Sequence, residues 1–245
     1  IGLNFSKTDK SLLFRTRDFN ISKAIQYCFS AFFIMYISRY ISLILNAIFE
    51  KFGYDISVIS SKGLAVTGLG TAILIVYNCI IAPVTEELFF RGMLLRVLSK
   101  ANQRFAIIAT SIFFGLAHGN LPQFVLAFLV GIFLSHITLK HGSIIPAIIV
   151  HIFLNTTNTI IGSADFKGTK LLILNLIIQI LAAIGAFMLL TFRIHDKLPA
   201  TTPHQSKRGF AIAIKKPVLL IAFGIQAIYL IMLIFGVNIF SVLLS

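Results

Sequence analysis

The stretch LLILNLIIQILAAIGAFMLLTFR, residues 171–193, contains no charged side chain before its last residue, Arg193. A helix needs about 20 predominantly apolar residues to cross the hydrocarbon core of a bilayer. This stretch has the required length and composition. We therefore expect a transmembrane helix here, and the rest of the chain to be organised around helices of the same kind.

Other stretches of this kind lie on either side of it. The composition agrees, because 58% of the 245 residues are hydrophobic, only 12% are charged and the mean hydropathy is +0.95. These values are typical of an integral membrane protein with several helices. We predict an all-α, polytopic transmembrane helix bundle of about eight membrane-associated helices. A short helix is expected near 84–99, and spans near 24–49, 64–82, 105–119, 122–139, 144–162, 171–193 and 218–243.

The chain is expected to form a single integral membrane domain over residues 1–245. Its polar motifs all fall within a core at 64–162. A cytoplasmic linker is predicted near 194–217, where Pro, Ser, Thr and Lys are frequent.

The formal net charge of +13 comes from basic residues that lie in loops beside the hydrophobic stretches. This distribution favours orientation by the positive-inside rule over binding of nucleic acid. Five basic residues precede the first span, four lie in 91–104 and six in 193–216, whereas the loops near 50–62 and 163–170 hold two each. We therefore expect a cytoplasmic N-terminus and, with one span after the linker, an external C-terminus.

Both cysteines, Cys28 and Cys79, lie in apolar stretches, where a free thiol packs as a small hydrophobic side chain. The sequence predicts neither a disulfide framework nor a thiolate metal site, and we expect no cofactor.

Two adjacent acids, Glu86 and Glu87, lie where the chain is otherwise apolar, in Pro83-Val-Thr-Glu-Glu-Leu-Phe-Phe-Arg-Gly92. A carboxylate in hydrocarbon is costly and seldom persists without a partner or a function. Residues four apart share a helix face, so Glu87 is expected to pair with Arg91, which leaves Glu86 about a quarter turn away as the unpaired carboxylate. Alternatively, both acids bind Arg91 and Arg96 and only hold the helix in place. The other six acids all lie in polar segments: Asp9, Asp18, Glu50, Asp55, Asp165 and Asp196.

Three more polar side chains lie within apolar surroundings. His118 is at the end of a span, and His151 and Asn155 are four apart within another, so one helix face carries an imidazole and an amide. Each alone is explained by capping or by hydrogen bonds between helices. Because these groups and Glu86 come from three hydrophobic helices, one shared cavity is the simplest way to satisfy them together.

The remaining histidines are not expected to belong to the site. His136 lies within a span near the loop with Lys140 and His141, and we interpret it as an interfacial residue. His195 and His204 lie in the predicted cytoplasmic loop.

Three motifs in this order resemble a known family: Glu86-Glu87-x-x-x-Arg91, Phe114-x-x-x-His118 and His151-x-x-x-Asn155. They are similar to the motifs of the CAAX protease and bacteriocin-processing (CPBP, or Abi) family of intramembrane endopeptidases. The resemblance covers residues 86–155.

The resemblance implies peptide hydrolysis without an acyl-enzyme. Glu86 and His118 would activate a water molecule, and His151 and Asn155 would bind the oxyanion that forms at the scissile carbonyl. Glu87 and Arg91 would be structural.

Two other functions stay open. In one, Glu86, His118 and His151 bind a catalytic zinc ion, although no His-Glu-x-x-His motif is present. In the other, the protein is not an enzyme but a bacteriocin immunity protein or a proton-coupled transporter that uses the same buried groups as a relay.

The substrate is expected to be a peptide or protein at the membrane. The resemblance allows prenylated CAAX C-termini, bacteriocin leader peptides and peptide pheromones. The Ile, Phe and Lys-rich composition favours a bacterial plasma membrane, and bacteria generally lack CAAX prenylation, so peptide or leader processing is the favoured activity.

Overall fold

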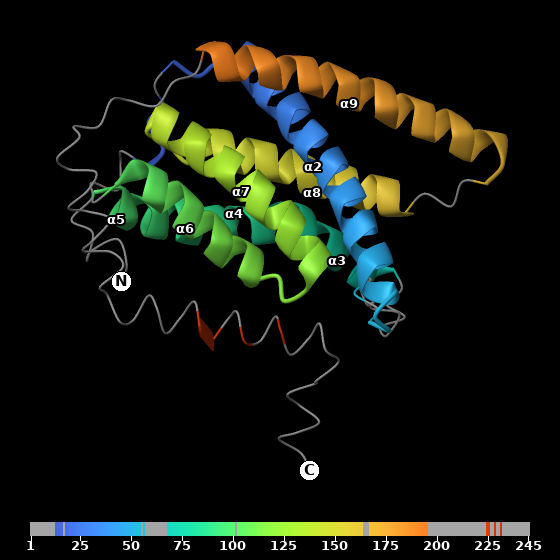
Figure 1. Ribbon diagram of the computed structural model, residues 1–245. Helices are drawn as coiled ribbons and strands as arrows, with labels where there is room; N and C mark the ends of the chain where they lie inside the picture. Colours follow the sequence, from blue (N-terminus) through green and yellow to red (C-terminus); the bar gives the residue numbers. More distant parts are fainter. Residues whose placement is uncertain are drawn as a thin grey trace. The chain divides into compact units, whose positions relative to one another are not determined.

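The computed structural model describes residues 13–16, 18–54, 56, 68–100, 102–163, 167–195, 224–225, 228 and 231 (Figure 1). Every regular element in this part of the chain is helical, which confirms the predicted all-α fold class. The helices are α2 (Ile21–Glu50), α3 (Leu69–Val76), the π-helical turn η2 (Tyr77–Ile81), α4 (Ala82–Glu87), the π-helix η3 (Leu88–Leu95), α5 (Arg96–Ser99), α6 (Gln103–Leu116), α7 (Leu121–His141), α8 (Ile145–Ser163) and α9 (Thr169–His195).

Within the described residues, five helices are long and apolar enough to cross a membrane, which confirms a polytopic helix bundle. They are Ile21–Glu50, Leu69–Ser99, Leu121–His141, Ile145–Ser163 and Thr169–Thr191. The helix α6 has only 14 residues and rises about 21 Å, so it is shorter than the span expected near 105–119. Nearly all of the expected span at 218–243 and of the linker at 194–217 lies outside the described residues.

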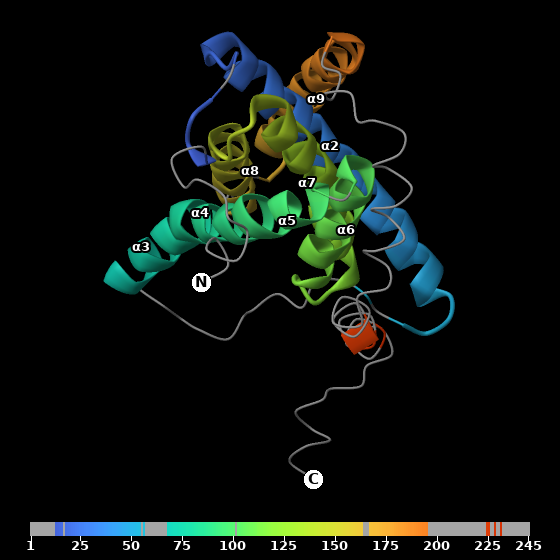
Figure 2. The ribbon, with the colours of Figure 1, turned by 90° about the vertical axis from the view of Figure 1, so that its left-hand side faces the viewer.

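One predicted boundary is wrong. The sequence indicated separate helices at 64–82 and 84–99, but Leu69–Ser99 forms one continuous helical segment (Figure 2). Pro83 lies in the first turn of α4, where a missing N–H is tolerated. The preceding turn, η2, widens to the π-helical pattern, and Ala82 N–H donates to Tyr77 O, five residues back.

Asparagine side chains begin three of the helices. Asn20 Oδ1 accepts from Lys23 N before α2, Asn102 Oδ1 from Phe105 N before α6, and Asn120 Oδ1 from Gln123 N before α7. Such caps satisfy backbone donors that a helix start leaves without partners. At the other end of α7, Gly142 adopts a φ of +65°, which a glycine tolerates without strain.

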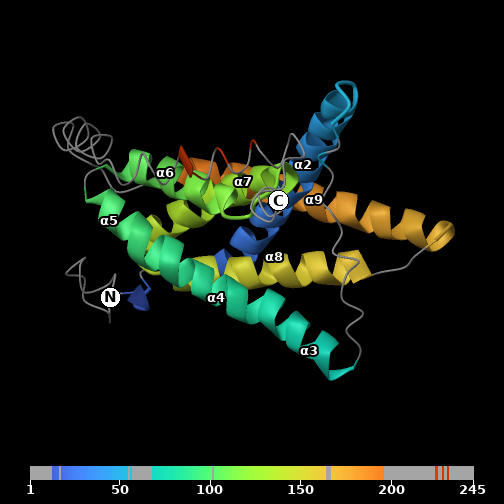
Figure 3. The same ribbon diagram turned by 90° about the horizontal axis from the view of Figure 1, so that it is seen from below.

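The chain divides into two compact units, each built from three stretches. The first comprises Ile1–Tyr36, Ser61–Leu94 and Phe133–Pro199, and the second comprises Ile37–Ser60, Leu95–Ile132 and Ala200–Ser245. Within the first unit, α8 packs against η2 and α4, and Figure 3 shows α8 running beside α4.

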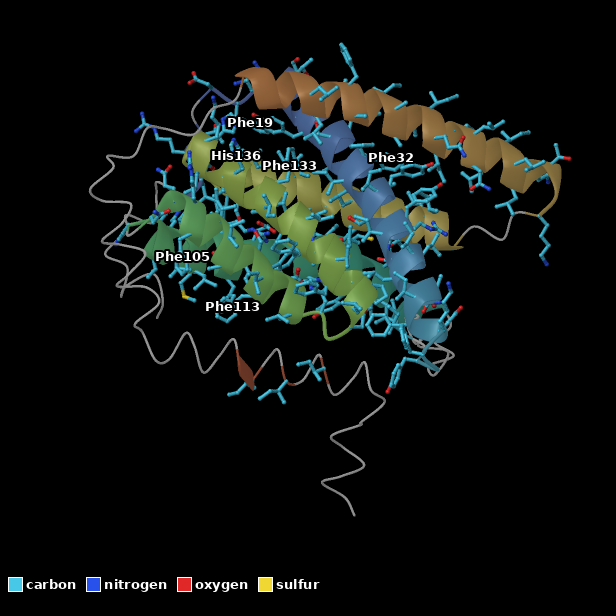
Figure 4. The ribbon with its side chains drawn as sticks, in the orientation of Figure 1. Phe19, Phe32, Phe105, Phe113, Phe133 and His136 are labelled. Carbon is cyan, nitrogen blue, oxygen red and sulfur yellow. The ribbon has the colours of Figure 1, made fainter. Side chains whose placement is uncertain are left out.

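A buried aromatic cluster also belongs to the first unit. The ring of Tyr27 lies 6.3 Å from Phe19 and 5.9 Å from Phe133, both labelled in Figure 4, and its hydroxyl lies 2.8 Å from His141 Nε2. Tyr27 and His141 are fully buried. This hydrogen bond satisfies two polar groups inside an apolar cluster, so it fixes the end of α7 on α2.

Candidate active site

The two adjacent acids lie in different environments. Glu87 is fully buried, whereas the side chain of Glu86 is 32% exposed. Successive helical residues are turned by about 100°, so only one of the two can face the packed interior. Arg91 is also fully buried, and its Nη1 donates to Glu87 Oε1 at 2.7 Å, as the spacing of four predicts.

His151, almost buried on α8, contacts both acids. Its Nδ1 lies 2.8 Å from Glu87 Oε1, and its Nε2 lies 3.7 Å from Glu86 Oε2. The Glu87 carboxylate, ionised beside Arg91, can only accept, so the proton of this hydrogen bond belongs to Nδ1. Nε2 then faces Glu86 at a distance too long for a direct hydrogen bond, yet short enough for both atoms to contact one water or substrate atom.

The charges of this group nearly cancel. Glu86 and Glu87 contribute two negative charges and Arg91 contributes one positive charge, so a protonated His151 makes the group neutral. Opposite charges at short range in a low-dielectric interior attract strongly, so the Glu87–Arg91 pair is held together inside the protein.

Asn155 lies one turn after His151 on α8 and faces the same helical segment. Its Nδ2 donates to the backbone carbonyl of Asn78, in η2, at 2.9 Å. An amide has two N–H donors, so Asn155 retains one beyond this bond. The sequence did not predict this contact, because its acceptor is a backbone carbonyl and every residue type has one.

His118 lies in the second compact unit, and its membership in the site remains a prediction. Its Nδ1 donates to Phe114 O at 2.8 Å, and its ring packs edge-on against Phe114 with centroids 5.0 Å apart. The carbonyl can only accept, which assigns the proton to Nδ1. In its neutral form His118 therefore presents Nε2 as a proton acceptor.

Several other sequence interpretations can be compared with the structure. Glu87 pairs with Arg91 and also binds His151, a contact that the sequence did not indicate. His136 is partly buried within α7 (Figure 4), and His141, placed in a loop by the sequence, is the fully buried last residue of that helix. The side chain of His195 and all of His204 lie outside the described residues.

In the part of the chain that the structure describes, Cys28 and Cys79 are free thiols, and no three His, Cys, Asp or Glu side chains are grouped as metal ligands. The Sγ of Cys79 lies 3.5 Å from Thr159 Oγ1 on α8. The contacts of this cysteine are thus those of packing between helices.

Comparison with known protein families gives a match. Residues 68–157 match the family model described as type II CAAX prenyl endopeptidase Rce1-like, a match consistent with the CPBP family. The matched stretch includes Glu86, Glu87, Arg91, His118, His151 and Asn155. No curated protein and no solved structure matches the chain.

Proposed function

We propose that this chain, whose residues 68–157 are Rce1-like, is an intramembrane endopeptidase that hydrolyses a peptide bond with a water molecule activated by Glu86 and His118. At the level of the family the match supports a CAAX-type intramembrane endopeptidase. The observation that carries the finer proposal is the placement of His151 Nε2 3.7 Å from Glu86 Oε2, in a group held by the buried Glu87–Arg91 pair.

In this mechanism Glu86 takes a proton from the water, and the resulting hydroxide forms a bond to the scissile carbonyl carbon. Glu86 suits this role because its side chain is partly exposed, whereas Glu87 is fully buried and already bound to Arg91 and His151. When the C–N bond breaks, the proton passes from Glu86 to the leaving amine, so the carboxylate is regenerated.

His151 and Asn155 are proposed to donate to the oxyanion. Because Nδ1 of His151 is bound to Glu87, only Nε2 faces the site, and it donates when the ring is an imidazolium. A positioned donor of this kind lowers the barrier by about 3 to 4 kcal/mol in other acyl-transfer enzymes.

The proposed substrate is a peptide or protein segment at the membrane: a leader peptide, another membrane-associated peptide or a CAAX-like C-terminus. We place the enzyme in a bacterial plasma membrane with a cytoplasmic N-terminus, since basic residues dominate the segment before α2. Substrate would reach the site within the bilayer, where the surroundings exclude bulk water and strengthen electrostatic contacts.

The direct test is Glu86→Gln, assayed by cleavage of a reporter peptide in proteoliposomes. Loss of the general base should lower kcat by about 10² to 10⁴-fold. Glu50→Gln is the matched control, because Glu50 is an exposed acid at the end of α2 whose carboxylate accepts from Asn46 Nδ2, and the variant should retain activity.

Cleavage by Glu86→Gln at the wild-type rate would refute the assignment of Glu86 as the general base. Protection against a bacteriocin that survives Glu86→Ala, or substrate flux without cleavage, would instead support an immunity protein or a transporter. Activity lost to a chelator and restored by zinc would support the zinc mechanism.

A further inference from the structure

The backbone of the Glu86 helix has one acceptor that its own helix cannot satisfy. In η2, Ala82 N–H donates to Tyr77 O, five residues back. In the same register the next donor is residue 83 and its acceptor is Asn78 O. Residue 83 is proline, which has no N–H, so Asn78 O receives no bond from that position.

Asn155 supplies the missing donor from another helix. Its Nδ2 lies 2.9 Å from Asn78 O, within ordinary hydrogen-bond range. A carbonyl without a partner is costly in a bilayer, where water does not replace the lost donor, and side chains of neighbouring helices commonly satisfy the acceptors that a proline releases.

This bond lies between two other contacts of α8 with the segment 78–87, each about one turn of α8 away. His151 binds Glu87, Asn155 binds Asn78, and Thr159 contacts Cys79 at 3.5 Å. Contacts separated by one turn each fix both the sliding and the rotation of one helix on the other. The position of His151 Nε2 relative to Glu86 depends on that register.

We propose that Asn155 is a positioning residue that acts together with Pro83: the proline releases Asn78 O, and the Asn155 amide binds it and locks α8 in the register that places His151 beside Glu86. The catalytic consequence rests on the proposed peptidase function, whereas the lock itself does not. One N–H of the Asn155 amide thus binds Asn78 O, and the second N–H stays available for the proposed contact with the oxyanion.

The first experiment is a double-mutant cycle of Asn155→Ala and Pro83→Ala, measured by thermal unfolding in mild detergent. Alanine at position 83 restores an N–H that can satisfy Asn78 O within the helix. Asn155→Ala should therefore lower the unfolding midpoint in the parent protein, and the drop should shrink by about half or more in the Pro83→Ala background. Equal drops in both backgrounds would overturn the proposal.

Asn158→Ala is the matched control. Asn158 is an exposed asparagine on the same helix, and its replacement should have the same small effect in both backgrounds. If Asn155→Ala does not yield folded protein, Asn155→Ser takes its place in the cycle, because serine stays polar and is too short to reach Asn78 O.

The second experiment measures register rather than stability. Thr159→Cys, made in a Cys28→Ser background, places a second thiol beside Cys79. The rate at which the two thiols form a disulfide on oxidation then reports how α8 lies on η2. Asn155→Ala should slow the cross-linking several-fold with either residue at position 83, because an N–H at position 83 satisfies Asn78 O but does not replace the bond to α8. A rate that does not respond to Asn155→Ala would contradict the lock.

Peptide cleavage then separates the lock from catalysis. If Asn155 positions His151, the loss of kcat in Asn155→Ala should accompany the slower cross-linking. A loss of kcat with unchanged cross-linking would assign Asn155 to the oxyanion alone. If the wild-type protein cleaves no peptide, the proposed function fails, but the unfolding and cross-linking cycles still decide whether the lock exists.

Discussion

At the scale of single residues, Glu87 joins Arg91 and His151 in the candidate site, although the sequence suggested only a structural partner for Arg91. Its Oε1 atom receives Arg91 Nη1 and lies 2.8 Å from His151 Nδ1. This carboxylate therefore neutralises a buried cation and also sets the tautomer and direction of the imidazole. In serine proteases a carboxylate has the same second role toward the catalytic histidine.

Glu87→Gln should damage both stability and activity. It leaves Arg91 buried without its charge partner, which costs about 3 to 5 kcal/mol when one member of a buried pair is removed. It also removes the ionic acceptor that orients His151, so kcat should fall by up to about 10⁴-fold. Thermal unfolding and reporter cleavage measure the two effects separately.

The matched variant is Glu87→Gln combined with Arg91→Gln. Removing both charges should recover much of the lost stability while activity stays low, because His151 still lacks its carboxylate. If activity returned along with stability, Glu87 would have no role in orienting His151.

The residue scale also shows what spacing along one helix can and cannot predict. The four-residue rule correctly gave the pair Glu87–Arg91, since both residues belong to one segment. It gave no means to predict that His151 contacts both acids, because that depends on how α8 is rotated against another helix. The role of Asn78 was equally hidden, since its backbone carbonyl is the group that matters.

At the scale of elements, most spans followed from hydrophobic length, and the error came at Pro83. A proline in the first turn of a helix is compatible with continuation, and here the π-helical turn η2 absorbs it. Hydropathy alone gives no sign of such a turn. The two predicted helices therefore merged into Leu69–Ser99.

Close packing of α2 and α9 within the first unit gives a prediction at this scale. A Cβ on Gly185 would collide with the backbone carbonyl of Phe29 and lie 2.9 Å from Phe33 Cβ. Small residues at such crossings let helices approach closely in membranes. Gly185→Ala should therefore destabilise the protein by about 1 to 3 kcal/mol, measured by thermal unfolding in detergent.

Gly162→Ala serves as the control for Gly185→Ala. Gly162 lies in α8 and its added Cβ would meet open space. Alanine should be neutral there or stabilise the helix by up to about 1 kcal/mol. Similar destabilisation at both positions would show that the α2–α9 contact is not as close as the structure has it.

At the scale of the whole molecule, two of the candidate membrane-spanning helices bury only a small share of their residues inside the protein. Only 11% of the most apolar window of α9 is buried inside the protein, and the corresponding value for Leu69–Ser99 is 22%. Exposed Leu, Ile and Phe side chains over such lengths require a lipid environment. The composition predicted this class of protein correctly, because hydropathy is a sum over the chain and does not depend on packing.

The protein should therefore stay in the membrane fraction after an alkaline carbonate wash and appear in the supernatant only with detergent, as followed by immunoblotting. Release by carbonate alone would contradict multi-pass insertion.

An epitope placed before Ile21 tests the predicted cytoplasmic N-terminus. In right-side-out vesicles, added protease should reach this epitope only after the vesicles are opened.

The unequal surroundings of Glu86 and Glu87 make the site sensitive to the number of residues before it. One amino acid inserted between Pro83 and Glu86 would swing every later side chain by about 100° around the helix axis. Glu86 would then take the buried position of Glu87, and Glu87 would turn away from the core together with Arg91. Homologous chains that keep this chemistry should accordingly tolerate substitutions along this segment far better than they tolerate a change in its length.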